Sequence, residues 1–240
     1  MMNRMKSAQE TKTVGILAGV GPLAGAFFYK RLIELTPAES DQQHLKVILI
    51  SDPGILSRVD HLLERGLSPA PALQHVARQL QALGADFIAI PSATTHAYWK
   101  EISKVVRIPV INLLAEVGQT LHRSGHKHII FLATQATAQK RLFDPYLAPD
   151  AIPIYPEEPV QKQVQYLIDA VKSGASPGDL HARLSAVTEQ CWAAKADCVV
   201  LACTELPIIF PDRAENETVI SITDVLAKAV IANATAKESR

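Results

Sequence analysis

The chain has 240 residues, 48% hydrophobic and 20% charged, a composition that suits a globular protein with one large core or two smaller ones. Its 24 basic and 24 acidic residues give a formal net charge of zero, which argues against a nucleic acid or an anionic membrane as partner. Three cysteines, confined to residues 191–203, cannot form a disulfide framework and favour a reducing compartment.

The N-terminal residues 1–12 read MMNRMKSAQETK and contain no apolar stretch. We expect them to form a disordered extension, because a signal peptide or an anchor needs an apolar segment. No apolar run elsewhere approaches the roughly 18 residues of a membrane span. The sequence therefore predicts a cytoplasmic protein that does not contact a membrane.

Short apolar runs rich in Ile and Val alternate with longer helical patterns along the rest of the chain. Their consecutive apolar positions are typical of strands buried on both faces of a parallel sheet. The runs are TVGILAG (13–19), KVILIS (46–51), DFIAIP (86–91), IPVINLL (108–114), HIIFLAT (128–134), CVVLAC (198–203) and VISI (219–222). A helix is predicted over residues 70–84, ending at Gly84, with Leu73, Val76, Ala77, Leu80 and Leu83 on its apolar face. This alternation predicts an α/β fold.

The chain also repeats itself at a nearly constant offset. GADFIAIPSATTH (84–96) resembles KADCVVLACTELP (195–207), so that Asp86 matches Asp197 and Ser92 matches Cys203, each 111 residues apart. Residues 16–18 match 131–133 at an offset of 115. We expect two pseudosymmetric three-layer α/β lobes, and ligands of such sheets bind at the carboxyl ends of the strands, where Ser92, Cys203, Gly19 and Thr134 fall. Two facing lobes would place Ser92 and Cys203 on opposite walls of one cleft.

Two acid/base groups on opposite sides of a planar intermediate are what inversion at a carbon requires. Six motifs, in order and spacing, resemble the aspartate/glutamate racemase family, whose typical motifs are GGMGP, DQEH, an NPQ-to-DR segment, PCNTAH and GCTE. The strings in this chain are GILAGVGP (15–22), DQQH (41–44), SDPGILSR (51–58), PSATTH (91–96), DAVKSG (169–174) and ACTELP (202–207). The resemblance runs from about residue 13 to the C-terminus.

The resemblance implies cofactor-independent racemisation of an acidic amino acid by two cysteines, in a cleft between two lobes. It implies a first lobe over residues 13–115, a second over 116–222, and a C-terminal helix over about 223–236 that packs back on the first lobe. A homodimer is also implied. By residue, Cys203 is one catalytic cysteine and Ser92 stands where the other is expected. The implied substrate-binding residues are Arg58, Ala93, Thr94, Thr137, Lys172, Thr204 and Glu205.

Ser92 differs from the expected cysteine in acidity. The reference pKa of a cysteine is about 8.5, whereas an alcohol ionises more like water, at about 15.7, a gap of roughly 10 kcal/mol. Positioning and oriented dipoles recover only part of that gap. Ser92 is thus expected to be a poor base for a Cα proton, and Cys203 is the residue that we expect to move it.

Three functions stay open at this point. The first is a racemase that works better in one direction, and the second is a decarboxylase or isomerase of a related dicarboxylic acid that needs a single thiol. The third is a protein that binds an amino acid or dicarboxylate without catalysis. No pyridoxal phosphate is expected, because no lysine is assigned to form its Schiff base.

Several other side chains invite a functional reading. Asp52 replaces the Asn of the family's NPQ segment, and Thr134 and His96 lie in loops that could serve the site. HRSGHKH (122–128) holds three histidines, but it fits a solvated turn before a strand better than a metal site. Cys191 and Cys198 are expected to pack in the core, since free cysteines are among the most buried residues. No metal is predicted.

Overall fold

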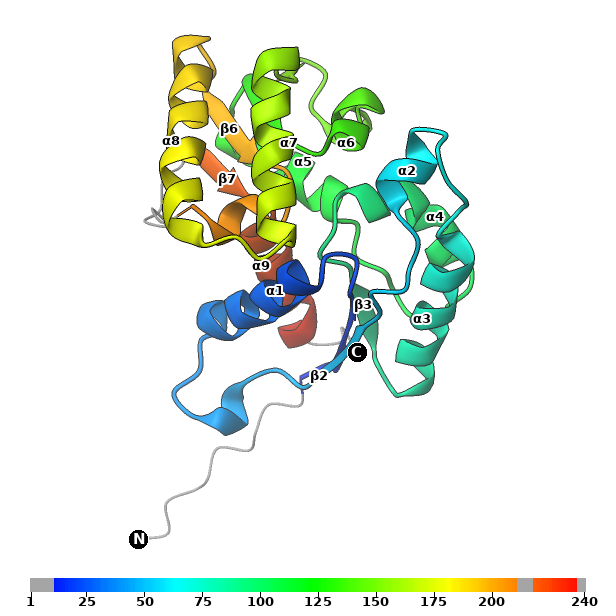
Figure 1. The fold of residues 1–240 in the computed structure, drawn as a ribbon. Coiled ribbons are helices and arrows are strands. Elements are labelled where there is room, and N and C mark those ends of the chain that lie inside the picture. The colour runs from blue at the N-terminus through cyan, green and yellow to red at the C-terminus, as the bar shows by residue number, and fades with distance from the viewer. Residues whose placement is uncertain (1–10, 211–217, 237–240) are drawn as a thin grey trace, which may run out of the picture.

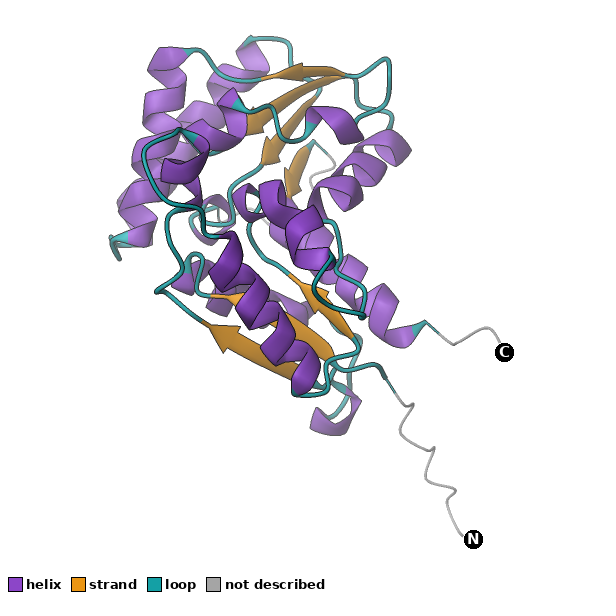
Figure 2. Ribbon diagram, turned by 90° about the vertical axis from the view of Figure 1, so that its right-hand side faces the viewer, coloured by secondary structure: helices purple, strands orange, loops and turns teal. Residues whose placement is uncertain are grey.

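The computed structural model describes residues 11–210 and 218–236, so most of the predicted extension, residues 1–10, lies outside the described part. Two separate parallel sheets form the centres of two lobes (Figures 1 and 2). The first sheet has the strand order β2-β1-β3 and the second β5-β4-β6-β7. The strands are β1 (Val14–Ala18), β2 (Val47–Ser51), β3 (Phe87–Ala89), β4 (His128–Leu132), β5 (Ile152–Ile154), β6 (Cys198–Leu201) and β7 (Val219–Ser221). The predicted α/β fold is confirmed.

Helices connect and cover these strands. They are α1 (Pro22–Leu35), α2 (Arg58–Leu62), α3 (Ala70–Ala82), α4 (Trp99–Ser103), α5 (Leu113–Ser124), α6 (Gln135–Gln139), α7 (Glu158–Lys172), α8 (Pro177–Ala193) and α9 (Ile222–Thr235). Short 3₁₀ helices follow several strands or helices, namely η1 (Asp41–Gln43), η2 (Thr94–Tyr98), η3 (Asp144–Tyr146) and η4 (Leu206–Ile208). Within the described ranges, no helix is long and apolar enough to cross a membrane.

Alternate side chains of each central strand point to opposite faces, and both faces are covered. In β4, Ile129 and Phe131 pack toward α5 and α9, whereas Ile130 and Leu132 pack toward α7 and α8. In the first lobe, Ile16 of β1 packs with α1 residues while Leu17 packs with α3 residues. This arrangement explains why the strands are apolar at consecutive positions, and it makes each lobe three layers deep.

Two sequence predictions need correction. Leu83 is 62% exposed, because α3 ends at Ala82 and Leu83 is its C-cap. Gly84 follows with a φ of +93°, the left-handed conformation expected of a terminating glycine. The run 108–114 is not a strand, since only Val110 forms a single parallel bridge, with Ile88. The Asn112 side chain accepts from the N–H groups of residues 114 and 115 and so starts α5.

The internal repeat has a physical basis in two aspartates. The Asp86 carboxylate accepts from Thr13 N–H at 2.6 Å just before β1, and the Asp197 carboxylate accepts from His128 N–H at 3.1 Å at the start of β4. Each aspartate donates its own N–H to the same residue's carbonyl, at 2.8 Å and 3.0 Å. The matched residues thus align equivalent strands, β3 beside β1 and β6 beside β4.

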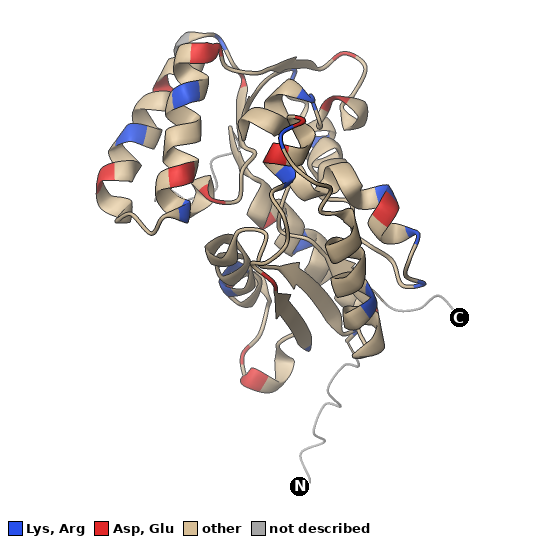
Figure 3. Cartoon of the chain, turned by 45° about the vertical axis from the view of Figure 1, so that its right-hand side comes forward, with Lys and Arg blue, Asp and Glu red and all other residues tan. Residues whose placement is uncertain are grey.

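Helices α5 and α9 join the lobes. Each follows the last strand-like position of its sheet, and the two pack against each other, with α9 also against α1. A single apolar core therefore runs from β1 and β3 through these helices to β4 and β6. Residue 115, the predicted boundary between the lobes, lies inside α5. Acidic and basic residues are spread over both lobes (Figure 3), in keeping with the zero formal charge.

Candidate active site

Most of the predicted site residues follow the carboxyl ends of strands. Ser92 follows β3, Cys203 follows β6, Thr134 follows β4 and Asp52 follows β2. Ser92, Thr94, Thr134, Thr137, Cys203, Thr204 and Glu205 are all buried. The structure thus places a set of buried hydroxyl, thiol and carboxylate groups where open α/β sheets bind ligands.

The Cys203 thiol faces a carboxylate. Its Sγ donates to Glu205 Oε2 at 2.9 Å, and the Thr204 hydroxyl lies 3.4 Å from the same oxygen. Burial and the Glu205 carboxylate raise the pKa of Cys203 well above its ordinary value, while Lys172 acts in the opposite direction. Cys203 is therefore a protonated thiol at neutral pH in this state, and Glu205 is the nearest acceptor of its proton.

Glu205 also contacts the loop that follows β1 in the other lobe. A Cβ built on Gly21 would lie 2.7 Å from Glu205 Oε1, and Gly21 has a φ of +129°. The positive φ favours glycine at this point of the GVGP motif, and a methyl group here would have to displace the Glu205 carboxylate. The carboxylate of the second lobe thus lies directly against the backbone of the first.

Three threonine hydroxyls meet across the lobes. Thr94 Oγ1 lies 3.0 Å from Thr137 Oγ1 and 3.2 Å from Thr134 Oγ1, and Thr134 donates to Thr137 at 3.0 Å. The Thr134 hydroxyl also accepts from Thr137 N–H at 3.2 Å, as the N-cap of α6. These hydroxyls form a compact set of donors that suits a carboxylate. Figure 1 shows α2 of the first lobe beside α6 of the second, near this junction.

Ser92 lies in a different hydrogen-bond environment from Cys203. Its Oγ accepts from the Thr95 hydroxyl at 2.8 Å and from Thr95 N–H at 3.4 Å. No carboxylate is recorded as its partner within the described ranges. Its position opposite Cys203 stays a prediction.

His96 is occupied by the backbone. Its Nε2 accepts from Leu113 N–H at 3.0 Å, so the proton is on Nδ1, which donates to the Ser92 carbonyl at 2.7 Å. Burial lowers the pKa of His96 and keeps the ring neutral. This geometry ties the loop after β3 to the first turn of α5, a structural role.

Arg58 links α2 to the loop after β1. Its Nη2 donates to the Val20 carbonyl at 2.7 Å, and Nη1 donates to the Leu56 carbonyl at 3.1 Å. Its Nε is buried with no hydrogen-bond partner among the described residues. Burial lowers the pKa of Arg58, and Glu205 opposes that shift. A partly satisfied guanidinium close to the site retains capacity for an anionic ligand.

The contacts of the remaining predicted residues say less about the chemistry of the site. Lys172 is exposed at the last position of α7, yet close enough to act electrostatically on Cys203. Asp52 Oδ1 accepts from Gly54 N–H at 2.9 Å and so shapes its own turn. Ala93 is buried in the apolar core and offers no polar side chain. No cluster of three or more metal-ligating side chains occurs within the described residues.

A family model for Asp/Glu/hydantoin racemase matches residues 17–230. The chain belongs to the Asp/Glu/hydantoin racemase family. It is 24% identical over 233 residues to the broad specificity amino-acid racemase RacX of Bacillus subtilis (strain 168), spanning 94% of this chain and 100% of that protein. The resemblance seen in the motifs is thereby confirmed, and the chain is an isomerase of the racemase class.

Solved structures agree with this family. The Picrophilus torridus aspartate racemase matches with a TM-score of 0.81 and 30% identity, covering 93% of this chain and 94% of that one. An aspartate racemase homologue from Pyrococcus horikoshii OT3 matches with a TM-score of 0.74 at 18% identity, covering 94% and 100% of the two chains. At 18% identity, the similarity to the Pyrococcus horikoshii protein concerns the fold alone.

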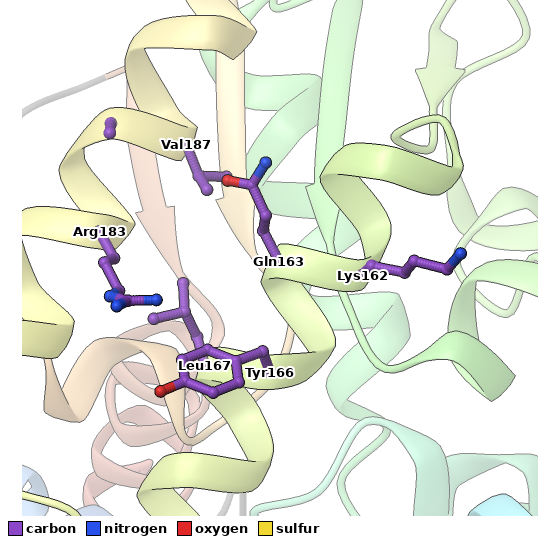
Figure 4. A pocket seen from close by; sticks show the side chains of 7 residues that line it. Lys162, Gln163, Tyr166, Leu167, Arg183 and Val187 are labelled. Carbon is purple, nitrogen blue, oxygen red and sulfur yellow. The ribbon is translucent and has the colours of Figure 1, made fainter.

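A groove of about 350 Å³ lies away from the candidate site residues, between α7 and α8 (Figure 4). Tyr166 and Leu167 of α7 and Val187 of α8 line it, and the Arg183 guanidinium lies 5.3 Å from the centre of the Tyr166 ring. None of the predicted site residues is among its lining residues. The groove is therefore separate from the candidate active site.

Sequence reasoning missed two residues at the candidate active site. Thr95 was not singled out, although a hydroxyl three residues after Ser92 at the start of a helical turn is a familiar local hydrogen-bond pattern. Tyr98 was also missed. Its hydroxyl lies 2.7 Å from His61 Nδ1, so it holds α2 against η2, and no local pattern indicates this contact between distant residues.

Proposed function

We propose that the chain is a cofactor-independent amino-acid racemase acting on an acidic amino acid, with Cys203 as the principal acid/base. The observation that carries the proposal is the buried Cys203 thiol donating to Glu205 at 2.9 Å. An aspartate racemase that is 30% identical to the chain supports aspartate as the first substrate to test. The relative named for broad specificity supports a panel that includes other amino acids.

In the proposed reaction, the Cys203 proton passes to the Glu205 carboxylate, leaving a thiolate and a carboxylic acid. The thiolate removes the Cα proton, and the electron pair of the broken C–H bond is delocalised into the substrate carboxylate. A water molecule beside Ser92 would then protonate the opposite face of Cα, and the hydroxide that remains would take the proton from Glu205, which completes inversion and restores both groups. The threonine hydroxyls at 94, 134 and 137 are proposed to hold a substrate carboxylate, which would replace their contacts with one another.

Charge recognition falls to two basic residues. Arg58, whose Nε has no partner among the described residues, and the exposed Lys172 are proposed to bind the side-chain carboxylate, together with Thr204. Thr94 and Lys172 lie in different lobes, so a substrate that bridges them would hold the lobes together. An acidic amino acid has the two carboxylates that this arrangement requires.

The test is Cα proton exchange in D₂O, followed by NMR, with each enantiomer of aspartate, glutamate and a neutral amino acid. We expect deuterium to enter at Cα of an acidic amino acid, and Cys203→Ala to abolish the exchange. Exchange of one enantiomer only would assign one-base chemistry to Cys203. Binding without exchange of any amino acid would refute the racemase, and CO₂ release from a malonate-type acid would select a one-thiol decarboxylase instead.

A further inference from the structure

Thr95 is a fully buried threonine whose polar groups converge on Ser92. Its hydroxyl donates to Ser92 Oγ at 2.8 Å, and its N–H makes a longer contact with the same atom at 3.4 Å. The motif PCNTAH, on which the family resemblance partly rests, has alanine at this position. Relative to that motif, this chain differs at both positions, with Ser92 where the motif has cysteine and Thr95 where it has alanine.

The repeat makes the contrast with Cys203 explicit. Residue 206, which follows Cys203 by the same three positions, is the fully buried Leu206, whose side chain has no hydrogen-bond donor and whose N–H donates to the Cys203 carbonyl at 3.1 Å. The thiol at 203 faces an acceptor, Glu205, whereas the oxygen at 92 faces donors. The two matched positions thus have opposite hydrogen-bond polarity.

We propose that Thr95 is a positioning residue that makes Ser92 a fixed hydrogen-bond donor to the substrate. A hydroxyl has one proton to donate and two lone pairs that accept. Since the donors of Thr95 occupy the lone pairs of Ser92, the Ser92 proton is the group left to interact with a ligand. Ser92 then stabilises negative charge on the substrate and does not remove a proton. This role rests on the proposed function, in which charge develops on the substrate when Cys203 takes the Cα proton.

The same geometry must stabilise an anion placed at position 92. A thiol introduced there tests this, because stabilisation of its thiolate lowers its pKa. In Ser92→Cys, the pH dependence of iodoacetamide alkylation at residue 92, resolved by peptide mass spectrometry, gives the pKa of that thiol. We expect the pKa to rise by about one to two units when Thr95→Val is added, because one hydrogen bond to an anion is lost. Thr95→Ser, which keeps the hydroxyl, should leave it unchanged. Equal pKa values with threonine and valine at 95 would overturn the proposal.

This titration needs no turnover, so it separates the role of Thr95 from the proposed function. If the wild-type protein exchanges no amino acid, the racemase fails while the thiol at 92 still decides the positioning role. If exchange occurs, Thr95→Val should reduce kcat about three- to tenfold and Thr95→Ser should restore it. A kcat within twofold of wild type in Thr95→Val would count against the proposal.

Two further variants control for folding. Thr223→Val removes another fully buried threonine hydroxyl, one with no hydrogen-bond partner among the described residues, and should leave kcat unchanged. If Thr95→Val does not fold, Thr95→Ala is used in its place. The same reduction of kcat is expected of that variant. A loss of kcat shared by Thr223→Val would mean that the Thr95 effect is structural, which would overturn the positioning role.

Discussion

Replacing Glu205 with glutamine removes the negative charge that faces Cys203 while keeping a side chain of the same size. The thiol Sγ and the nearer carboxylate oxygen are 2.9 Å apart. At an effective dielectric constant of 20, a unit charge at that distance disfavours the thiolate by ~6 kcal/mol, equivalent to about 4 pKa units. The charge is shared by two oxygens and the amide retains a hydrogen bond, so we expect the pKa of Cys203 to fall by about 2 units.

The assay is the pH profile of iodoacetamide alkylation at Cys203, resolved by peptide mass spectrometry. Burial raises the pKa of Cys191 to about 11 and of Cys198 to about 12, so these thiols serve as internal references that should not move. Glu189→Gln, which removes a charge from the exposed surface of α8, is the matched control. An unchanged or higher pKa of Cys203 in Glu205→Gln would refute the view that this carboxylate keeps the thiol protonated.

Two further predictions concern stability and the loop after β1. Because the folded-state pKa of Cys198, about 12, exceeds the unfolded value, its contribution to stability is complete below about pH 8.5 and is lost as the pH rises toward 12. Urea unfolding at pH 8 and pH 10 should therefore show an alkaline loss about 2 kcal/mol smaller in Cys198→Ala, and equal losses would contradict this. Gly21→Ala should displace Glu205, lower the pKa of Cys203 and destabilise the fold, as seen by alkylation and thermal unfolding. Gly125→Ala, also at positive φ but with open space around it, should destabilise without moving that pKa.

The sheet architecture follows from local sequence, but short elements at its edges do not. Ile129 to Leu132 are apolar at every position because each face of β4 meets its own helices, and this signal is readable without a structure. The edge strand β5 (Ile152–Ile154) has only three partly exposed residues and gives no such run. The stretch 108–114 is apolar enough to suggest a strand, but the side chain of Asn112 caps the first turn of α5, so the chain starts a helix there.

The sequence predicts where the site residues lie along the fold, but it does not predict which of their atoms are in contact. The repeat alone places Ser92 and Cys203 after equivalent strands, since an offset of 111 residues links them and the aspartates that align those strands. Which atoms meet depends on how the two lobes pack. The contact between Thr94 and Thr137 crosses the lobes, and the contact of Glu205 with Gly21 does the same, so neither is encoded in any local stretch.

The two halves of the proposed site place Ser92 and Cys203 in equivalent loops, after β3 and β6, but surround them with opposite hydrogen-bonding groups. At Cys203 an acceptor faces the reactive atom, so a proton is stored there and can be exchanged with Glu205. At Ser92 donors face the reactive atom, so negative charge near it is stabilised and proton removal by it is not. A racemase built this way should exchange faster with the enantiomer whose Cα–H bond points toward Cys203, because that bond faces a thiol, whereas the bond toward Ser92 faces no side chain able to take the proton. Ser92→Cys would then place a second thiol among donors that favour its ionised form, and exchange of the other enantiomer should increase.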